Sequence, residues 1–113
     1  MKTHRRVAVS DELDFDNAMA NATAAILASG ADRIYSVLMA AGYRFGDLMA
    51  TRHGPAAYRI WMNISDLVDD DRGPLSEEEA LSVATQAARE WQTLDTRSQE
   101  QVDAYFARWS DSV

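Results

Sequence analysis

The stretch GPAAYRIWMNISDLVD, residues 54–69, decides the fold of this 113-residue chain. Its apolar side chains recur every three or four positions, the spacing of one face of an α-helix; they are Ala57, Ile60, Trp61, Ile64, Leu67 and Val68. Proline is tolerated in the first turn of a helix, so Gly54 and Pro55 open a helix expected over about 56–69. A helix with a tryptophan on its apolar face needs other apolar helix faces to cover it, and the pattern therefore predicts a helical bundle.

Ahead of this stretch, helical periodicity predicts two longer helices and one short helix. The first begins at Ser10 or Asp11, which are both good N-caps, and stops at Gly30. The second ends at Gly42, and the short helix covers about 45–51.

After the stretch, two capping signals predict two more helices. Ser76 and Glu79 form a capping box, in which each side chain satisfies the other residue's unpaired backbone N–H, and a long helix follows. Thr96 or Ser98 caps the last helix. The aromatic residues expected on the apolar faces of these two helices are Trp91, Tyr105, Phe106 and Trp109.

The chain as a whole is predicted to be all-α, a single compact bundle of about five helices over residues 10–113 after a flexible basic arm over residues 1–9. Hydrophobic residues make up 47% of the sequence, which is typical of a globular domain. The absence of cysteine excludes disulfides and thiolate zinc sites. No apolar stretch is long enough for a signal peptide or a membrane span, so we expect a cytoplasmic protein without membrane contact.

Charge is distributed unevenly along the chain, whose formal net charge is −7. Residues 1–32 carry a net −2, residues 33–60 a net +3 from four arginines, and residues 61–113 a net −8. The protein is therefore expected to offer partners two electrically different surfaces. Arginine outnumbers lysine ten to one, a bias typical of GC-rich bacterial or phage genomes.

The carboxylates of residues 66–79 form one predicted negative surface. Its protein-binding candidates are Asp66, Asp69, Asp70, Asp71, Glu77 and Glu78. Aspartates at the C-terminal end of a helix are mildly unfavourable for that helix, so their presence favours contact with a basic partner. The first hypothesis is a small regulatory or adaptor protein, without enzymatic activity, that binds another protein through this acidic surface.

The alternative hypothesis is a DNA-binding regulator that uses the arginine-bearing segment. Residues 46–63 resemble a helix-turn-helix unit, because Ala50, Gly54 and Ile60 have the spacing of its small residue, turn glycine and aliphatic residue. The cations that would then meet phosphates or bases are Arg5, Arg6, Arg44, Arg52 and Arg59.

Residues 55–109 also resemble an HMG box. The segment 57–61 (AYRIW) is similar to the aromatic-rich first helix of that family, Pro74 stands at its loop proline, and 88–94 (AREWQTL) is similar to the end of its central helix. Tyr105 matches a tyrosine of its last helix. The resemblance implies three helices that bend DNA through the minor groove, although the family's basic face is absent from this chain.

No residue pattern typical of an enzyme or a metal site occurs in the sequence. His4 and His53 are the only histidines and have no metal-ligand spacing, and the glycines are too scattered for a phosphate-binding loop. We therefore expect no catalytic residues, no metal and no cofactor. The aromatic surface of Trp61, Trp91 and Trp109 exceeds what a small bundle must bury, which leaves a homodimer as an open alternative.

Overall fold

The structure is a computed structural model that describes residues 9–68 and 74–112, with side chains over 12–68 and 74–110. Over these residues the fold is all-α and has no strand, as the sequence predicts. Its elements are α1 (Val9–Leu27), the 3₁₀ turn η1 (Ala31–Arg33), α2 (Ile34–Gly46), α3 (Gly54–Leu67), α4 (Glu77–Thr93) and α5 (Gln99–Ser112). Of the predicted basic arm, residues 1–8 lie outside the described residues, and Val9 belongs to α1.

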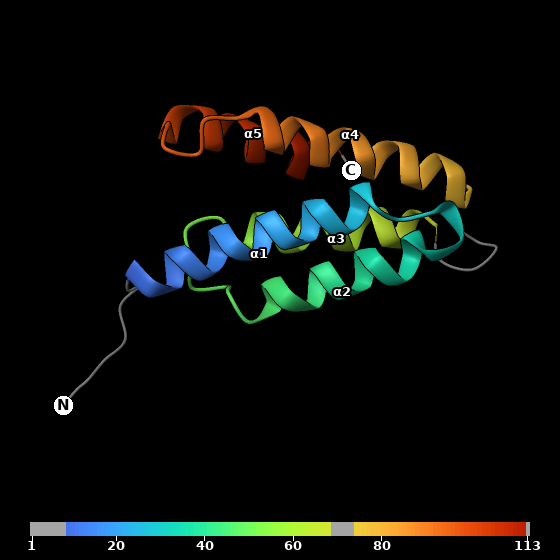
Figure 1. The fold of residues 1–113 in the computed structure, drawn as a ribbon, viewed down its shortest axis with the longest axis horizontal. Helices are drawn as coiled ribbons and strands as arrows, with labels where there is room; N and C mark the ends of the chain where they lie inside the picture. Colours follow the sequence, from blue (N-terminus) through green and yellow to red (C-terminus); the bar gives the residue numbers. More distant parts are fainter. Residues whose placement is uncertain (1–8, 69–73, 113) are drawn as a thin grey trace.

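The five helices form one bundle in which α4 and α5 run along one side and α2 along the opposite side (Figure 1). α1 packs against both α2 and α4, and α3 contacts α2, α4 and α5. The closest pair is the antiparallel hairpin of α2 and α3. Gly42 of α2 faces Met62 of α3, and Gly46 faces Tyr58.

The end of α2 differs from the prediction. Gly42 does not end the helix, because it lies buried against the side chain of Met62, where a Cβ atom would overlap the Met62 sulfur. α2 continues to Gly46, and the predicted short helix over 45–51 is therefore wrong. The segment 47–53 instead forms turns and bends. The glycine at position 42 serves close packing between two helices rather than helix termination.

Other helix boundaries agree with the sequence to within a few residues. α1 begins at Val9 and ends at Leu27, somewhat ahead of both predicted positions. The capping box is confirmed, since Ser76 Oγ accepts from Glu79 N at 3.1 Å and Ser76 N donates to Glu79 Oε1 at 2.9 Å. Of the two predicted caps of α5, Ser98 is the one used, because its Oγ accepts from Gln101 N at 3.3 Å.

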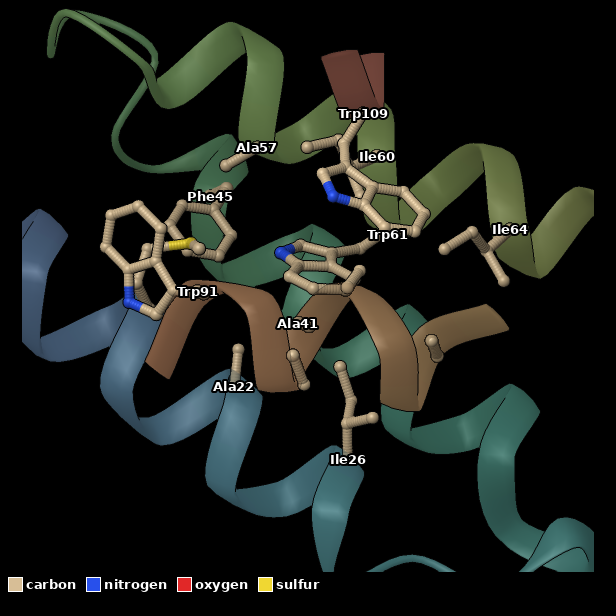
Figure 2. Packing of buried hydrophobic residues seen from close by; sticks show 14 of the residues in the cluster. Ala22, Ile26, Ala41, Phe45, Ala57, Ile60, Trp61, Ile64, Trp91 and Trp109 are labelled. Atoms are coloured by element: carbon tan, nitrogen blue, oxygen red, sulfur yellow. The ribbon is translucent and has the colours of Figure 1, made fainter. Parts of the chain in front are cut away.

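The core lies where the apolar faces of all five helices meet around α3 (Figure 2). Trp61 is completely buried, and Trp91 and Trp109 are 5% and 6% exposed. The hydroxyl of Tyr105 donates to the carbonyl of Ala87 at 2.9 Å, and burial raises the pKa of this phenol. All three tryptophans are covered within one chain, so they add no exposed aromatic surface, and the homodimer stays a prediction.

None of the described helices combines the length and the apolar character needed to cross a membrane.

A pair of glycine substitutions tests the close approach at the start of α3. A Cβ on Gly54 would overlap the carbonyl oxygen of Leu48 and lie 2.7 Å from Thr51 Oγ1, so the backbone must shift. We expect Gly54→Ala to lower the free energy of unfolding by about 2 kcal/mol or more in urea denaturation. Gly46→Ala is the matched control, since its Cβ would lie 3.9 Å from the nearest atom, Tyr58 Cε1. It should be neutral or raise stability by up to about 1 kcal/mol, because alanine favours helix over glycine. Equal effects of the two substitutions would contradict this account of the hairpin.

Candidate functional site

Part of the predicted acidic surface gathers where α3 ends and α4 begins. The backbone N–H of Leu75 donates to the carbonyl oxygen of Leu67 at 2.9 Å, which ties the two helix ends together. Asp66 in the last turn of α3 and Glu77 and Glu78 in the first turn of α4 are exposed at this end of the bundle. We name these three residues the acidic end. The other predicted members, Asp69, Asp70 and Asp71, lie outside the described residues.

The carboxylates of the acidic end have different roles from that of their neighbour Glu79. Hydrogen bonds from the backbone and side chain of Ser76 lower the pKa of Glu79, whose carboxylate is committed to capping α4. Glu77 and Glu78 gain only the favourable field of a helix N-terminus. No Lys, Arg or His nitrogen among the described residues lies within 4.0 Å of the three acidic-end carboxylates. Their charge is therefore available to a partner.

The predicted nucleic-acid-binding arginines are not brought together on one face. Arg44 lines a hollow between α1 and α2. Gly42 and Gly46 face α3, and residues two positions away from them on a helix point to the other side. Arg44 therefore points away from α3. Arg59 is exposed on α3, and Arg52 is paired with a carboxylate. Arg5 and Arg6 of the arm lie outside the described residues.

The three residues that match the helix-turn-helix spacing differ in their structural surroundings. Ala50 is exposed in the turn segment between α2 and α3, Gly54 is the first residue of α3, and Ile60 is buried in the core. The three helices implied over residues 55–109 by the likeness to an HMG box correspond to α3, α4 and α5, which share their core with α1 and α2.

A charged cluster that the sequence analysis did not anticipate joins the turn before α3 to α5. Asp103 of α5 accepts from Arg52 Nη2 at 3.0 Å through Oδ2, and its Oδ1 lies 2.8 Å from His53 Nε2. Arg52 Nε also donates to Asp103 Oδ1 at 3.3 Å. With its amide oxygen turned toward the guanidinium, Gln99 accepts from Arg52 Nη1 at 2.8 Å. Arg52 is therefore a cross-link between two elements rather than an unpaired cation.

His53 is held on both its edge and its face. While Nε2 faces Asp103, the imidazole ring stacks on Phe106 of α5 with centroids 4.6 Å apart and an interplanar angle of 16°. The histidine side chain is 17% exposed, so its ring forms part of the wall between core and solvent. The Arg52 guanidinium, and to a smaller extent His53, hold the pKa of Asp103 below its ordinary value.

A pocket of about 210 Å³ lies beside this cluster, between the N-terminal part of α1, the start of α3 and the α4–α5 connection. We name it the charged pocket, and the residues that define it are Glu12, Asp16, Arg52, His53, Trp91 and Arg97. Loss of surrounding water, and then the nearby charge of Glu12, raise the pKa of Asp16. In the described parts of the chain, no group of three or more His, Asp or Glu side chains has an arrangement that could hold a metal ion.

The sequence analysis missed Asp103 and the carboxylate pair of α1 for different reasons. The partners of Asp103 lie 50 and 51 residues away, which no local pattern reveals. Glu12 and Asp16 could have been noticed in the sequence. Like charges four residues apart destabilise a helix, so such a pair suggests another role. Comparison with protein family models, with curated proteins and with solved structures finds no match to this chain.

Removing the Asp103 carboxylate should weaken the cluster in a pH-dependent way. The folded-state pKa of Asp103 lies below its unfolded value of about 3.9, so the carboxylate stabilises the fold above that pH and loses its effect as the pH falls through the folded pKa. Asp103→Asn should therefore lower the free energy of unfolding at neutral pH. The difference in this free energy between wild type and variant should shrink as the pH is lowered. Urea denaturation of both proteins between about pH 2.5 and pH 7 measures the gap.

Asp95→Asn is the matched control for this substitution. Asp95 pairs with Arg97, two residues along the same loop, through a highly exposed guanidinium, so its removal should change the free energy of unfolding little at any pH. A gap between wild type and Asp103→Asn that persists unchanged at acid pH would rule out the ionic role of Asp103.

Proposed function

We propose that this protein is a non-enzymatic, cytoplasmic adaptor or regulator that binds a basic protein through its acidic end. The observation that carries the proposal is the hydrogen bond from Leu75 to Leu67 at 2.9 Å, which joins two helix ends that both bear exposed carboxylates. Asp66, Glu77 and Glu78 consequently share one end of the bundle, and no cation among the described residues neutralises them. Asp69, Asp70 and Asp71 follow Asp66 in the sequence and belong to the same proposed surface.

The electrostatics of the acidic end suit recognition more than strong affinity. An exposed ion pair contributes only about 0–1 kcal/mol, so three carboxylates alone cannot produce tight binding. Their summed field instead steers a partner of opposite charge and excludes partners of the same charge. Ions screen such interactions over about 8 Å at physiological ionic strength, so the association should weaken as salt is added.

Nucleic-acid binding is the second candidate, and it has less support. Phosphate binding needs several cations that follow one backbone, since neutralised phosphates supply most of the affinity. Arg52 is already paired with Asp103, and Arg44 and Arg59 lie on different helices with Arg44 turned away from α3. The candidate therefore rests on Arg5 and Arg6 together with arginines that do not share a face.

Neutralising the acidic end should weaken binding of a basic peptide. The variant Asp66→Asn/Glu77→Gln/Glu78→Gln removes three charges and keeps Glu79, so the capping box of α4 remains. With about 0.5 kcal/mol for each exposed pair, the loss is roughly 1.5 kcal/mol, or about tenfold in Kd at low salt. Fluorescence anisotropy of a labelled, lysine-rich peptide of about twelve residues, titrated with wild type and variant, measures it.

A second triple variant separates a local effect from one of net charge. Asp14→Asn/Asp47→Asn/Glu100→Gln makes the same change in charge at three exposed positions outside the acidic end, and its affinity for the peptide should stay within about twofold of wild type. Equal losses in the two triple variants would refute the acidic end as the binding surface. The same titration with a labelled DNA duplex tests the second candidate, and salt-sensitive binding of the duplex instead of the peptide would reverse the order of the two.

A further inference from the structure

The charged pocket lies at the opposite end of the bundle from the acidic end. Its residues come from the N-terminal part of α1, the turn before α3, the last turn of α4 and the start of α5 with the connection before it. The acidic end belongs instead to the end of α3 and the start of α4. On α4, Trp91 of the pocket follows Glu77 and Glu78 by about four turns of helix, so the two are separated by about 20 Å. Nothing in the argument for the acidic end uses the pocket, so each can be tested independently of the other.

The two carboxylates of the pocket, Glu12 and Asp16, are not paired with its two arginines. Both arginines on its wall already have carboxylate partners, Arg52 in Asp103 at 3.0 Å and Arg97 in Asp95 at 3.3 Å. Glu12 and Asp16, which lie four residues apart on one face of α1, have no hydrogen bond or ion pair with the described residues. Neither of these two carboxylates therefore forms an ion pair with a cation of the described residues.

A hydrogen-bond donor on the wall of the pocket also lacks an acceptor among the described residues. Trp91 is 5% exposed and lines the pocket, and its indole N–H donates to no acceptor among the described residues. The indole N–H groups of Trp61 and Trp109 are fully buried without an acceptor in the described parts of the chain, whereas the Trp91 N–H keeps some accessible surface. Figure 2 shows the Trp91 nitrogen on the side of the ring next to α1, the helix that carries Glu12 and Asp16.

The size and walls of the pocket restrict its ligand. A volume of about 210 Å³ is below the 300–1,000 Å³ typical of small-molecule sites and suits the head of a single side chain. The rings of Phe15, His53 and Trp91 supply flat apolar surface beside the two carboxylates. A guanidinium group matches both features, because it is planar, stacks on aromatic rings and donates in pairs to carboxylates.

We propose that the charged pocket is a binding site for a guanidinium group, carried by an arginine side chain of a protein partner or by a free alkylguanidine. Glu12 and Asp16 pair with the cation, Trp91 and Phe15 pack against its plane, and the indole N–H of Trp91 donates to an acceptor next to it, such as a peptide carbonyl. The Arg52–Asp103–His53 cluster holds the opposite wall in position.

The two carboxylates of the pocket have a cost in stability that pairing with a cation would reduce. The like charges of Glu12 and Asp16 repel each other, and the raised pKa of Asp16 means that folding disfavours its charged form. Asp16→Asn should therefore raise the midpoint of thermal unfolding at neutral pH while it weakens ligand binding. A residue with a purely structural role would not produce this opposite pair of effects.

The test is an NMR titration of the full-length protein with capped tripeptides. The probes are acetyl-Gly-Arg-Gly-amide and the same peptide with citrulline, which keeps the shape of arginine without its charge. The chain has three tryptophans, so three indole N–H signals report separately, and a Trp91→Phe variant assigns the relevant one. We expect millimolar binding of the arginine peptide with the shift concentrated on Trp91, and at least tenfold weaker binding of the citrulline peptide.

Two double variants decide between the pocket and general charge. Glu12→Gln/Asp16→Asn should weaken binding of the arginine peptide at least tenfold, and Asp66→Asn/Glu77→Gln, which removes the same charge from the acidic end, should change it less than twofold. Methylguanidinium is a third probe, which separates the two sources of the guanidinium group. If it binds as tightly as the arginine peptide, the ligand is a free guanidine. If it binds much more weakly than the peptide, the ligand is an arginine side chain of a protein. The proposal fails if citrulline binds as well as arginine, if the pocket variant binds normally, or if the shift lies on Trp61 or Trp109.

Discussion

The close approach of Gly54 to the carbonyl of Leu48 is the constraint on which the rest of the structure depends. The backbone N–H and the hydroxyl of Thr51 donate to this carbonyl, at 3.0 Å and 2.6 Å, so Thr51 and Gly54 both crowd one oxygen atom. Only a residue without a side chain fits at the first position of α3 under these conditions. The tight turn brings α3 back along α2, and the same turn directs Arg52 and His53 toward α5, where Asp103 holds them.

Phe106 connects this turn to the core. Its ring stacks on His53 and also contacts the rings of Phe15, Trp91 and Tyr105, so the wall of the charged pocket is continuous with the packed aromatic interior. Two polar groups in this interior lack a hydrogen-bond partner among the described residues. The N–H groups of Trp61 and Trp109 are buried without an acceptor among the described residues, and each such group costs about 1–3 kcal/mol. The apolar area that these two rings bury must offset that cost.

Local signals predicted the helices well, and non-local contacts account for what was missed. The apolar period around Trp61, the capping box at Ser76 and the cap at Ser98 each act within one or two turns of helix, and each is confirmed. Gly42 was misinterpreted because its reason lies on another helix, in the side chain of Met62. The site follows the same rule: the exposed carboxylates of the acidic end were predictable, whereas the Arg52–Asp103 pair joins residues 51 positions apart.

Pairing across the fold changes the meaning of the charge pattern along the sequence. The basic middle of the chain is partly neutralised by the acidic last third, since Arg52 pairs with Asp103, and Glu90 pairs with Arg108 within that third. Unpaired negative charge on the described residues then lies at both ends of the bundle, about 20 Å apart along α4. A basic segment that reached both ends would need at least about six extended residues. Engaging both sites at once would raise its affinity through effective concentration, without any new contact. With the two proposed sites taken together, a long, arginine-bearing segment fits both ends better than a compact basic domain does.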